Sequence, residues 1–368
     1  MKNRKPKPQE FLTSAVFVVI IGVLFALNII VPAPDILIAE RRMPARFPEL
    51  SLKTISSGSF MDKFDDYAAD HFIFRDAFRG VNSFMVFDLF MHSDMSGIYR
   101  DKNIGLGEFR RVNTPAYQQS AQKIKNVVES LDGLDMTIYY SLIPDKSIYA
   151  ENYMPGFDQT LAEEILSDAL SDYSYIRIAD RVAATDFYKT DLHWDQTKIV
   201  GVSDYILSSM GAHPGPVSYQ KASVGEFFGV YAGQIALPVK ADMLSYMEIP
   251  GLEASYLNEK TLQYESGPVY DSDRFDGVDP YDLFLRGPQP IIVLENDSAP
   301  ERELYLFRDS FGSSLAPLLA SSYSKITVID LRYINLMLLG TFIDFTPGSD
   351  VLFIYGSQIF NNPSVLQA

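Results

Sequence analysis

The segment LYLFRDSFGSSLAPLLASSYSKITVIDLRY, residues 304–333, predicts a strand, a turn that carries a serine, a helix and a second strand. Its first four residues are apolar or aromatic, as in a buried strand. Residues 308–314 are polar and mostly small and include Ser310; leucines at helical spacing and a second apolar run follow. A serine at such a turn faces a helix N-terminus, whose free N–H groups can stabilise an oxyanion. Ser310 is therefore a candidate nucleophile.

The sequence on either side alternates predicted helices with short apolar strands. Helices are predicted at residues 116–131, 161–170 and 194–209, strands at residues 137–143, 175–179, 291–294 and 351–355, and a hairpin at residues 97–109. This alternation predicts an α/β fold with a mostly parallel sheet and helices on both faces. Residues 215–287 are acidic, aromatic and predicted to be a loop-rich insertion.

The N-terminus predicts a membrane anchor. Residues 11–31 contain no charged residue and are long enough to span a bilayer as a helix. Four basic residues precede them, which predicts a cytoplasmic N-terminus and an extracytoplasmic main domain. A cleaved signal peptide is the alternative, although its apolar core would be shorter, about 7–15 residues. The predicted organisation is a tail at residues 1–10, an anchor at 11–31, a proline-rich linker at 32–56, a helical subdomain at 57–110 and the α/β domain at 111–368.

Composition narrows the classes of function. The net charge of −16 argues against nucleic acid as a partner, because phosphate groups require clustered Lys and Arg. The absence of Cys excludes a thiolate nucleophile and a cysteine-based zinc site. No motif implies a cofactor. The high aromatic content permits stacking against sugars.

A serine nucleophile needs a base, and the best candidate among the four histidines is His193, in the polar stretch KTDLHWD. Asp191 precedes it by two residues, and side chains at i and i+2 project to the same side of an extended chain. Asp191 can therefore orient the imidazole. Two alternatives remain open at this point. In one, Asp191 or Thr190 caps a helix and His193 packs at the surface; in the other, Asp191, His193 and Asp309 bind a metal.

The motifs TDLHWD, RDSFGSSLAPLLA and ITVIDLRY, in this order, resemble the DHHW family of bacterial exported proteins. These are relatives of the alginate O-acetylation proteins with an SGNH-hydrolase-like domain. The resemblance extends through residues 74–76, 143–146, 227–229 and 281–287 and covers roughly residues 55–360. It implies a three-layer α/β/α domain of the SGNH-hydrolase type. By position, it implies Ser310 as nucleophile, His193 as base and Asp191 as its orienter.

The chain departs from the family pattern at two positions. Leu192 stands where the family name implies His, and Arg308 stands where SGNH serine motifs commonly have Gly. A cation at position 308 could narrow access to the serine or bind an anionic substrate. The oxyanion donors are predicted to be the Ser310 N–H and Arg332. For Arg332, an ion pair with Asp330 or Asp309 is the alternative.

These features together predict a membrane-anchored, extracytoplasmic O-acetyltransferase or acetylesterase acting on a cell-surface or secreted polysaccharide. If the protein is a transferase, the resemblance implies a membrane-bound O-acyltransferase partner that supplies acetyl groups. The alternative is a catalytically inactive glycan-binding or scaffolding subunit, motivated by Arg308 and by the glycine and asparagine oxyanion donors of SGNH enzymes, which the motifs do not place in this chain. A metal-dependent hydrolase is the third hypothesis.

Overall fold

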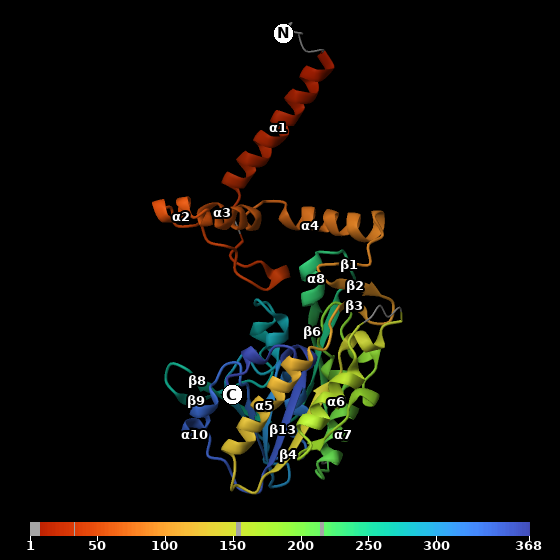
Figure 1. Cartoon of the computed structure of the whole chain (residues 1–368), viewed down its shortest axis with the longest axis vertical. Coiled ribbons are helices and arrows are strands. Elements are labelled where there is room, and N and C mark those ends of the chain that lie inside the picture. Colours follow the sequence, from red (N-terminus) through yellow and green to blue (C-terminus); the bar gives the residue numbers. More distant parts are fainter. Residues whose placement is uncertain (1–7, 33, 152–155, 214–216) are drawn as a thin grey trace. The chain divides into compact units, whose positions relative to one another are not determined.

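The structure, a computed structural model, describes residues 8–32, 34–151, 156–213 and 217–368 (Figure 1). The chain divides into two compact units. The first comprises Met1–His92 and Gly233–Pro238, and the second comprises Ser93–Ala232 and Val239–Ala368. The four basic residues on which the predicted orientation depends lie outside the described residues.

The first unit begins with the predicted apolar helix, α1 (Pro8–Ile30). Its stretch Phe11–Ile30 is 20 residues long and is not buried against the rest of the described chain. This length and composition would allow the helix to cross a bilayer, and a signal sequence near an N-terminus has the same properties. The helix is therefore confirmed, whereas its insertion in a membrane stays a prediction.

The remainder of the first unit is helical: α2 (Leu52–Ser56), α3 (Ser59–Asp70) and α4 (Arg75–Phe84), which continues into a π turn at Met85–Leu89. Phe60, Phe64 and Tyr67 form an aromatic side of α3 and contact the ring of Phe47 at centroid distances of 5.2–6.3 Å. The segment expected to be an extended linker thus contributes Phe47, which stays 59% exposed, and a short helix. The N-terminal stretch of this unit extends to His92, and the expected domain boundary at residue 110 stays a prediction.

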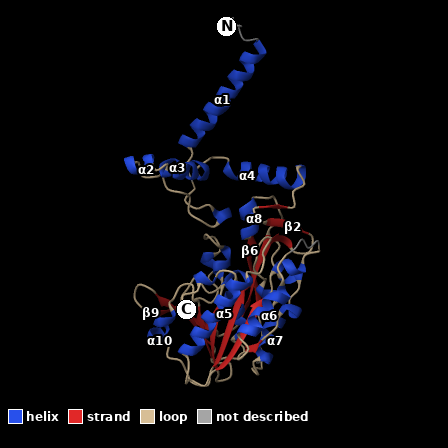
Figure 2. Cartoon of the chain, viewed as in Figure 1, coloured by secondary structure: helices blue, strands red, loops and turns tan. Residues whose placement is uncertain are grey.

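The second unit is built around an eight-stranded sheet (red in Figure 2) with the order β5-β4-β13-β11-β12-β10-β8-β9. The strands are β4 (Thr137–Ile143), β5 (Ser174–Tyr175), β8 (Glu253–Asn258), β9 (Gln263–Gly267), β10 (Ile291–Glu295), β11 (Glu303–Arg308), β12 (Lys325–Ile329) and β13 (Asp350–Gly356). From β5 to β12 each pair is parallel, and β10, β8 and β9 add antiparallel pairs. The predicted mostly parallel sheet is therefore confirmed.

Helices cover both faces of this sheet: α5 (Thr114–Ser130), α6 (Gln159–Ala169), α7 (Val200–Ser209) and α9 (Ser310–Leu319). Alternate side chains of β11 enter different cores, as the period of a strand requires. Leu304 and Leu306 pack with α7 and α9, whereas Tyr305 and Phe307 pack with α5 and α6. The result is the predicted three-layer α/β/α arrangement.

Smaller elements surround the sheet: β1 (Asp94–Met95), β2 (Ile98–Asp101), β3 (Gly105–Glu108), β6 (Gln220–Phe227), β7 (Asp242–Glu248), α8 (Val230–Ile235), α10 (Leu339–Phe342) and α11 (Ser357–Phe360). The predicted hairpin is β2–β3. The segment 215–287 is more regular than expected, because β6 and β7 pair with each other and β8 and β9 extend the main sheet. The helix expected from Trp194 starts only at Val200, since Trp194 bridges to Phe187 in extended backbone.

Candidate active site

Ser310 is the first residue of α9, and only Asp309 separates it from the end of the parallel strand β11. Asp309 caps the helix: one carboxylate oxygen accepts a hydrogen bond from the Phe311 N–H (3.0 Å), and the other accepts from the Gly356 N–H (2.7 Å). Burial raises the pKa of Asp309. Since Gly356 ends the neighbouring strand β13, the partly exposed Ser310 stands at the carboxyl ends of two adjacent parallel strands. Open α/β sheets bind their ligands at this edge.

The structure brings the three predicted catalytic residues together. His193 Nε2 lies 2.8 Å from Ser310 Oγ, and His193 Nδ1 lies 2.7 Å from Asp191 Oδ1. Asp191 is fully buried and His193 is nearly so. With Nδ1–H directed at the carboxylate, Nε2 is free to accept the serine proton. These distances suit general-base activation of a hydroxyl, and the catalytic role of the three residues stays a prediction.

The alternative in which Asp191 or Thr190 caps a helix is wrong. Asp195 is the residue that caps the next turn, Gln196–Lys198, because its carboxylate accepts from the Thr197 N–H. Leu192, the departure from the family name, packs against the apolar core and takes no part in the polar chain.

Two later segments hold Asp191 in place. Its second carboxylate oxygen accepts from the Val230 N–H (2.9 Å), and the Gly229 N–H donates to Thr190 Oγ1 (2.8 Å). A Cβ at position 229 would lie 2.4 Å from the Asp191 Cβ, so only glycine permits this approach. Asp242 accepts from the hydroxyl and the amide of Thr190 at 2.6 and 2.7 Å. Both oxygens of the Asp191 carboxylate are therefore committed to fixed donors.

Lys146 holds the backbone of the same segment in place. Its buried Nζ donates to the carbonyl oxygens of Tyr188 (2.6 Å) and Asp191 (2.9 Å), with a longer contact to Lys189 (3.4 Å). These three acceptors match the three N–H groups of an ammonium. Burial lowers the pKa of Lys146 to about 7. Lys146 thus fixes the backbone of the residues that carry the imidazole and its carboxylate.

Aromatic rings fix the plane of the imidazole. The Tyr281 ring stacks on His193 at a centroid distance of 3.9 Å and an angle of 9°, and the Phe311 ring lies 4.9 Å away. The Tyr281 hydroxyl donates to Ser314 Oγ (2.8 Å), which also accepts from Trp194 Nε1 (2.9 Å). The Tyr281 ring is thereby tied to α9, the helix that carries Ser310.

The two arginines near the serine are engaged in ion pairs. Arg308 is 1% exposed and its Nη1 lies 3.1 Å from Asp330 Oδ2. Arg332 donates to the same carboxylate at 2.6 and 2.9 Å, which is the alternative weighed for that residue. Gly312 lies inside α9 next to Arg308, where a Cβ would meet the Arg308 Cβ at 2.4 Å. Burial of its guanidinium keeps Arg308 from the surface that a substrate reaches, and these contacts lend no support to either arginine as an oxyanion or substrate ligand.

The other predicted oxyanion donor, the Ser310 N–H, belongs to the first turn of α9, whose amides have no acceptor within the helix. The Ser310 N–H is therefore available to a developing oxyanion.

The contacts of the two carboxylates argue against the metal hypothesis. The carboxylates of Asp191 and Asp309 are occupied by imidazole and backbone donors. Among the described residues, no group of three or more His, Asp or Glu side chains could hold a metal ion.

Four supporting residues had no role assigned from the sequence: Lys146, Gly229, Asp242 and Tyr281. Lys146, Gly229 and Tyr281 lie in segments that carry the family resemblance. The resemblance indicated that these segments matter, but it did not indicate what each residue contacts. Asp242 had no such signal. Its contact with Thr190 spans 52 residues of sequence and depends on the β6–β7 hairpin.

The fold and this geometry define a three-layer α/β/α domain with a serine after a parallel strand, which is the arrangement that the resemblance to SGNH-hydrolase-like proteins predicts. By sequence, no family model and no curated protein matches the chain. The fold is similar to that of a DHHW family protein from Eubacterium siraeum, with a TM-score of 0.60 and 16% identity over 74% of this chain and 94% of that one. The predicted relation to the DHHW proteins is therefore confirmed at the level of the fold.

Two further solved structures are similar. PatB1 from Bacillus cereus, solved with a sulfonyl adduct, has a TM-score of 0.56 and 17% identity over 73% of this chain and 96% of that one. The O-acetyltransferase domain of Pseudomonas putida AlgJ is more distant, with a TM-score of 0.43 and 12% identity over 72% of this chain and 92% of that one.

Proposed function

We propose that this protein is a serine-dependent enzyme that transfers or removes O-acetyl groups on a cell-surface or secreted glycan. The observation that carries the proposal is the unbroken line of hydrogen bonds from Asp191 through His193 to Ser310. Buried carboxylate, imidazole and serine in this order are the parts that acyl transfer through an ester intermediate requires.

In the proposed reaction, Ser310 Oγ attacks the acetyl carbonyl while His193 Nε2 takes the hydroxyl proton. Asp191 stabilises the imidazolium, and the negative charge on the former carbonyl oxygen is met by the Ser310 N–H at the start of α9. The C–O bond to the leaving alcohol then breaks, and His193 returns its proton to that alcohol. A sugar hydroxyl or water, deprotonated by His193, next attacks the carbonyl carbon of the acetyl-serine. The C–O bond to Ser310 Oγ then breaks, His193 returns the proton to Ser310 Oγ, and the acetylated sugar or acetate leaves.

A cavity of about 580 Å³ lies beside the segment that carries Asp191, and its lining includes neither Ser310 nor His193. Lys189 and Thr190 form one wall, next to Asp191, and Leu106, Asp242 and Met243 contribute to the others. This volume lies within the range of small-molecule sites and is enough for a sugar unit. Its charged rim offers hydrogen bonds to hydroxyl groups.

The proposed acetyl group, glycan substrate and extracytoplasmic location are supported by the sequence. The motifs shared with the DHHW family support acetyl chemistry on a polysaccharide, and they imply a membrane-bound O-acyltransferase as the acetyl donor if the enzyme is a transferase. The apolar helix α1 supports anchoring in the cell membrane, and the four basic residues that precede it in the sequence favour an N-terminus inside and a main unit outside.

The proposal is tested with the full chain in detergent and an aryl acetate as substrate. Ser310→Ala should abolish hydrolysis, whereas Ser313→Ala, a buried serine in the same helix, should leave most of it. An arylsulfonyl fluoride, which captures activated hydroxyl groups, should add its sulfonyl mass to a peptide containing Ser310. Equal hydrolysis by the wild type and Ser310→Ala would reject the proposed chemistry.

A non-catalytic glycan-binding or scaffolding subunit is the second candidate. It is favoured by Arg308, a buried cation in place of the Gly that is common in such serine motifs. Under this hypothesis, Ser310→Ala would match the wild type in the aryl acetate assay, and an acetylated polysaccharide would still be retained by the immobilised protein.

A further inference from the structure

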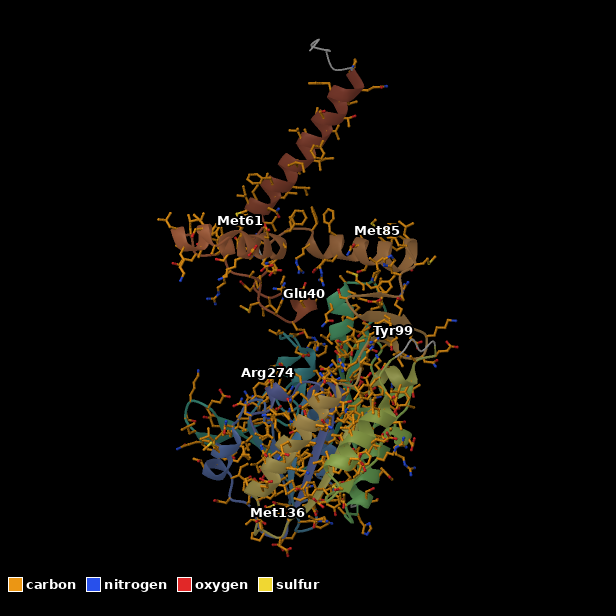
Figure 3. The ribbon with its side chains drawn as sticks, viewed as in Figure 1. Glu40, Met61, Met85, Tyr99, Met136 and Arg274 are labelled. Atoms are coloured by element: carbon orange, nitrogen blue, oxygen red, sulfur yellow. The ribbon has the colours of Figure 1, made fainter. Side chains whose placement is uncertain are left out.

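The outer side of α4 carries an apolar stripe that the proposed chemistry does not use. Phe74, Phe78, Val81 and Met85 follow one another at intervals of four, three and four residues, and 37–57% of each residue is exposed. At 100° per residue these positions fall within a sector of roughly 60°. Figure 3 labels Met85 on this helix, and Leu89 continues the stripe into the π turn. A continuous exposed apolar face of this kind marks an interaction surface.

The opposite side of α4 is fixed to its own unit. Arg75 and Arg79 both pair with Glu40. Arg79 also donates to the Gly233 carbonyl (2.8 Å), and the Ser83 hydroxyl donates to the Ile235 carbonyl. Because its polar side is held by these contacts, the helix cannot turn the stripe inward, and the phenyl rings stay directed away from the unit.

One hydrogen bond fixes where α4 begins relative to α1. The Ile73 N–H donates to Asn28 Oδ1 at 2.8 Å. Asn28 precedes the end of α1 at Ile30 by two residues, or about 3 Å along the helix axis. Figure 1 shows the end of α1 beside the connection between α3 and α4. The stripe therefore starts at the level where the apolar stretch of α1 ends.

We propose that α4 is an interfacial membrane helix, whose stripe lies in the headgroup region of the same bilayer that α1 spans. The proposal rests on the membrane anchoring put forward above. Lipid is the occupant because the stripe begins beside the end of the apolar helix α1, where Ile73 bonds to Asn28, and because its four side chains are apolar, which suits the acyl boundary. The neighbouring helix α3 differs: its exposed residues include Asp62, Asp65 and Asp66, as expected of a helix side in water.

The chain contains no cysteine, so single cysteines can be labelled without a background. The full chain is placed in phosphatidylcholine vesicles with a nitrobenzoxadiazole label at Phe78→Cys or Val81→Cys on the stripe. Asp65→Cys on α3 serves as the matched control, and Val19→Cys on α1 reports the anchor. Quenching is measured with lipids that carry a doxyl group at shallow or deep positions.

The expected result is a blue-shifted emission and severalfold stronger quenching by the shallow doxyl lipid at Phe78→Cys and Val81→Cys than at Asp65→Cys. The Val19→Cys label should be quenched best by the deep doxyl lipid. A deep Val19 label with stripe labels as exposed to water as Asp65 would overturn the interfacial helix and leave the anchor intact. A water-exposed Val19 label would contradict the membrane anchor and therefore also the interfacial helix. The proposed chemistry is tested independently by the aryl acetate assay.

Two other occupants have distinct signatures, and either would overturn the proposal. A second copy of the chain would give disulfide dimers of unlabelled Val81→Cys when dilute vesicles are treated with a mild oxidant, and the labelled variant would show no quenching by lipid. A different protein on the stripe would leave the labels exposed to water in vesicles of pure lipid.

Discussion

The two segments that supply the catalytic groups are built in different ways. Residues 303–319, which carry Ser310, are a strand and a helix joined by a single residue, and backbone hydrogen bonds hold most of them. Residues 188–196, which carry Asp191 and His193, contain little regular structure and depend on partners far away in sequence. These partners include Lys146, Val230 and Asp242.

The difference shows where such a site is vulnerable. A residue at the junction of a parallel strand and a helix keeps its place as long as the sheet forms. An irregular segment keeps its shape only if each side-chain contact is made, because its backbone groups find few partners among themselves. Substitutions around His193 should therefore lower kcat without unfolding the sheet.

The largest effect is expected from Asp191→Asn. The amide cannot hold the imidazole in the tautomer that leaves Nε2 free, so kcat for an aryl acetate should fall by about four orders of magnitude. Asp186→Asn, in the loop just before this segment, is the control and should keep most of the activity. A fall of less than about tenfold would show that Asp191 does not orient the base.

Gly229→Ala tests the contact between the second carboxylate oxygen and the backbone. The new methyl group would overlap the Asp191 Cβ and the Thr190 carbonyl, each at 2.4 Å, and push the segment away. A displacement of about 1 Å should lower kcat on the order of 100-fold. Gly201→Ala on α7, where a Cβ meets nothing within 4 Å, is the matched control. Equal kcat values for the two variants would contradict a structural role for the Gly229 contact.

Lys146→Met should lower kcat by about tenfold, since the backbone of Tyr188 and Asp191 loses its common donor. Lys123→Met is the control, because Lys123 donates to two backbone carbonyls at the C-terminus of the chain, at 2.7 and 2.8 Å, and not at the site. A kcat for Lys146→Met that equals that of Lys123→Met would rule out the supporting role.

The lowered pKa of Lys146 predicts that its contribution to the free energy of unfolding depends on pH. The pKa of Lys146 is about 7 in the folded chain and has the ordinary value of 10.5 when exposed. Between these values the unfolded chain binds more protons, so the contribution of Lys146 to the free energy of unfolding rises with pH, by at most about 1.4 kcal/mol per pH unit. Urea unfolding from pH 7 to 10 should show this rise in the difference between wild type and Lys146→Met. A difference that stays flat would mean that burial leaves the pKa unchanged.

The smallest effect on activity is expected from Arg308→Met, which lies in the strand and helix segment at residues 303–319. Asp330 keeps its pair with Arg332, so the free energy of unfolding should fall by only about 1–3 kcal/mol. KM and kcat should stay near the wild-type values, because the Arg308 guanidinium does not reach the substrate surface. An increase in KM confined to anionic esters would instead restore the substrate-binding hypothesis.

Much of the fold and part of the site could be predicted from the sequence. The strand at residues 137–143 and the unit of β11, α9 and β12 have strong apolar periodicity, because each element buries a face against the same sheet. The prediction failed at residues 194–199 and at 215–287. There the apolar spacing imitates a helix or is weak, and pairing with distant segments decides the backbone.

The position of Ser310 after a buried strand and at the start of a helix can be inferred from sequence alone, as can the two-residue spacing of Asp191 and His193. Both statements concern neighbours along the chain, for which backbone periodicity is sufficient. The approach of His193 Nε2 to within 2.8 Å of Ser310 Oγ, across 117 residues of sequence, depends instead on how the folded chain brings distant segments together. The same holds for Lys146, Gly229 and Tyr281, because which distant groups meet depends on how strands and loops pair, and no local pattern records it.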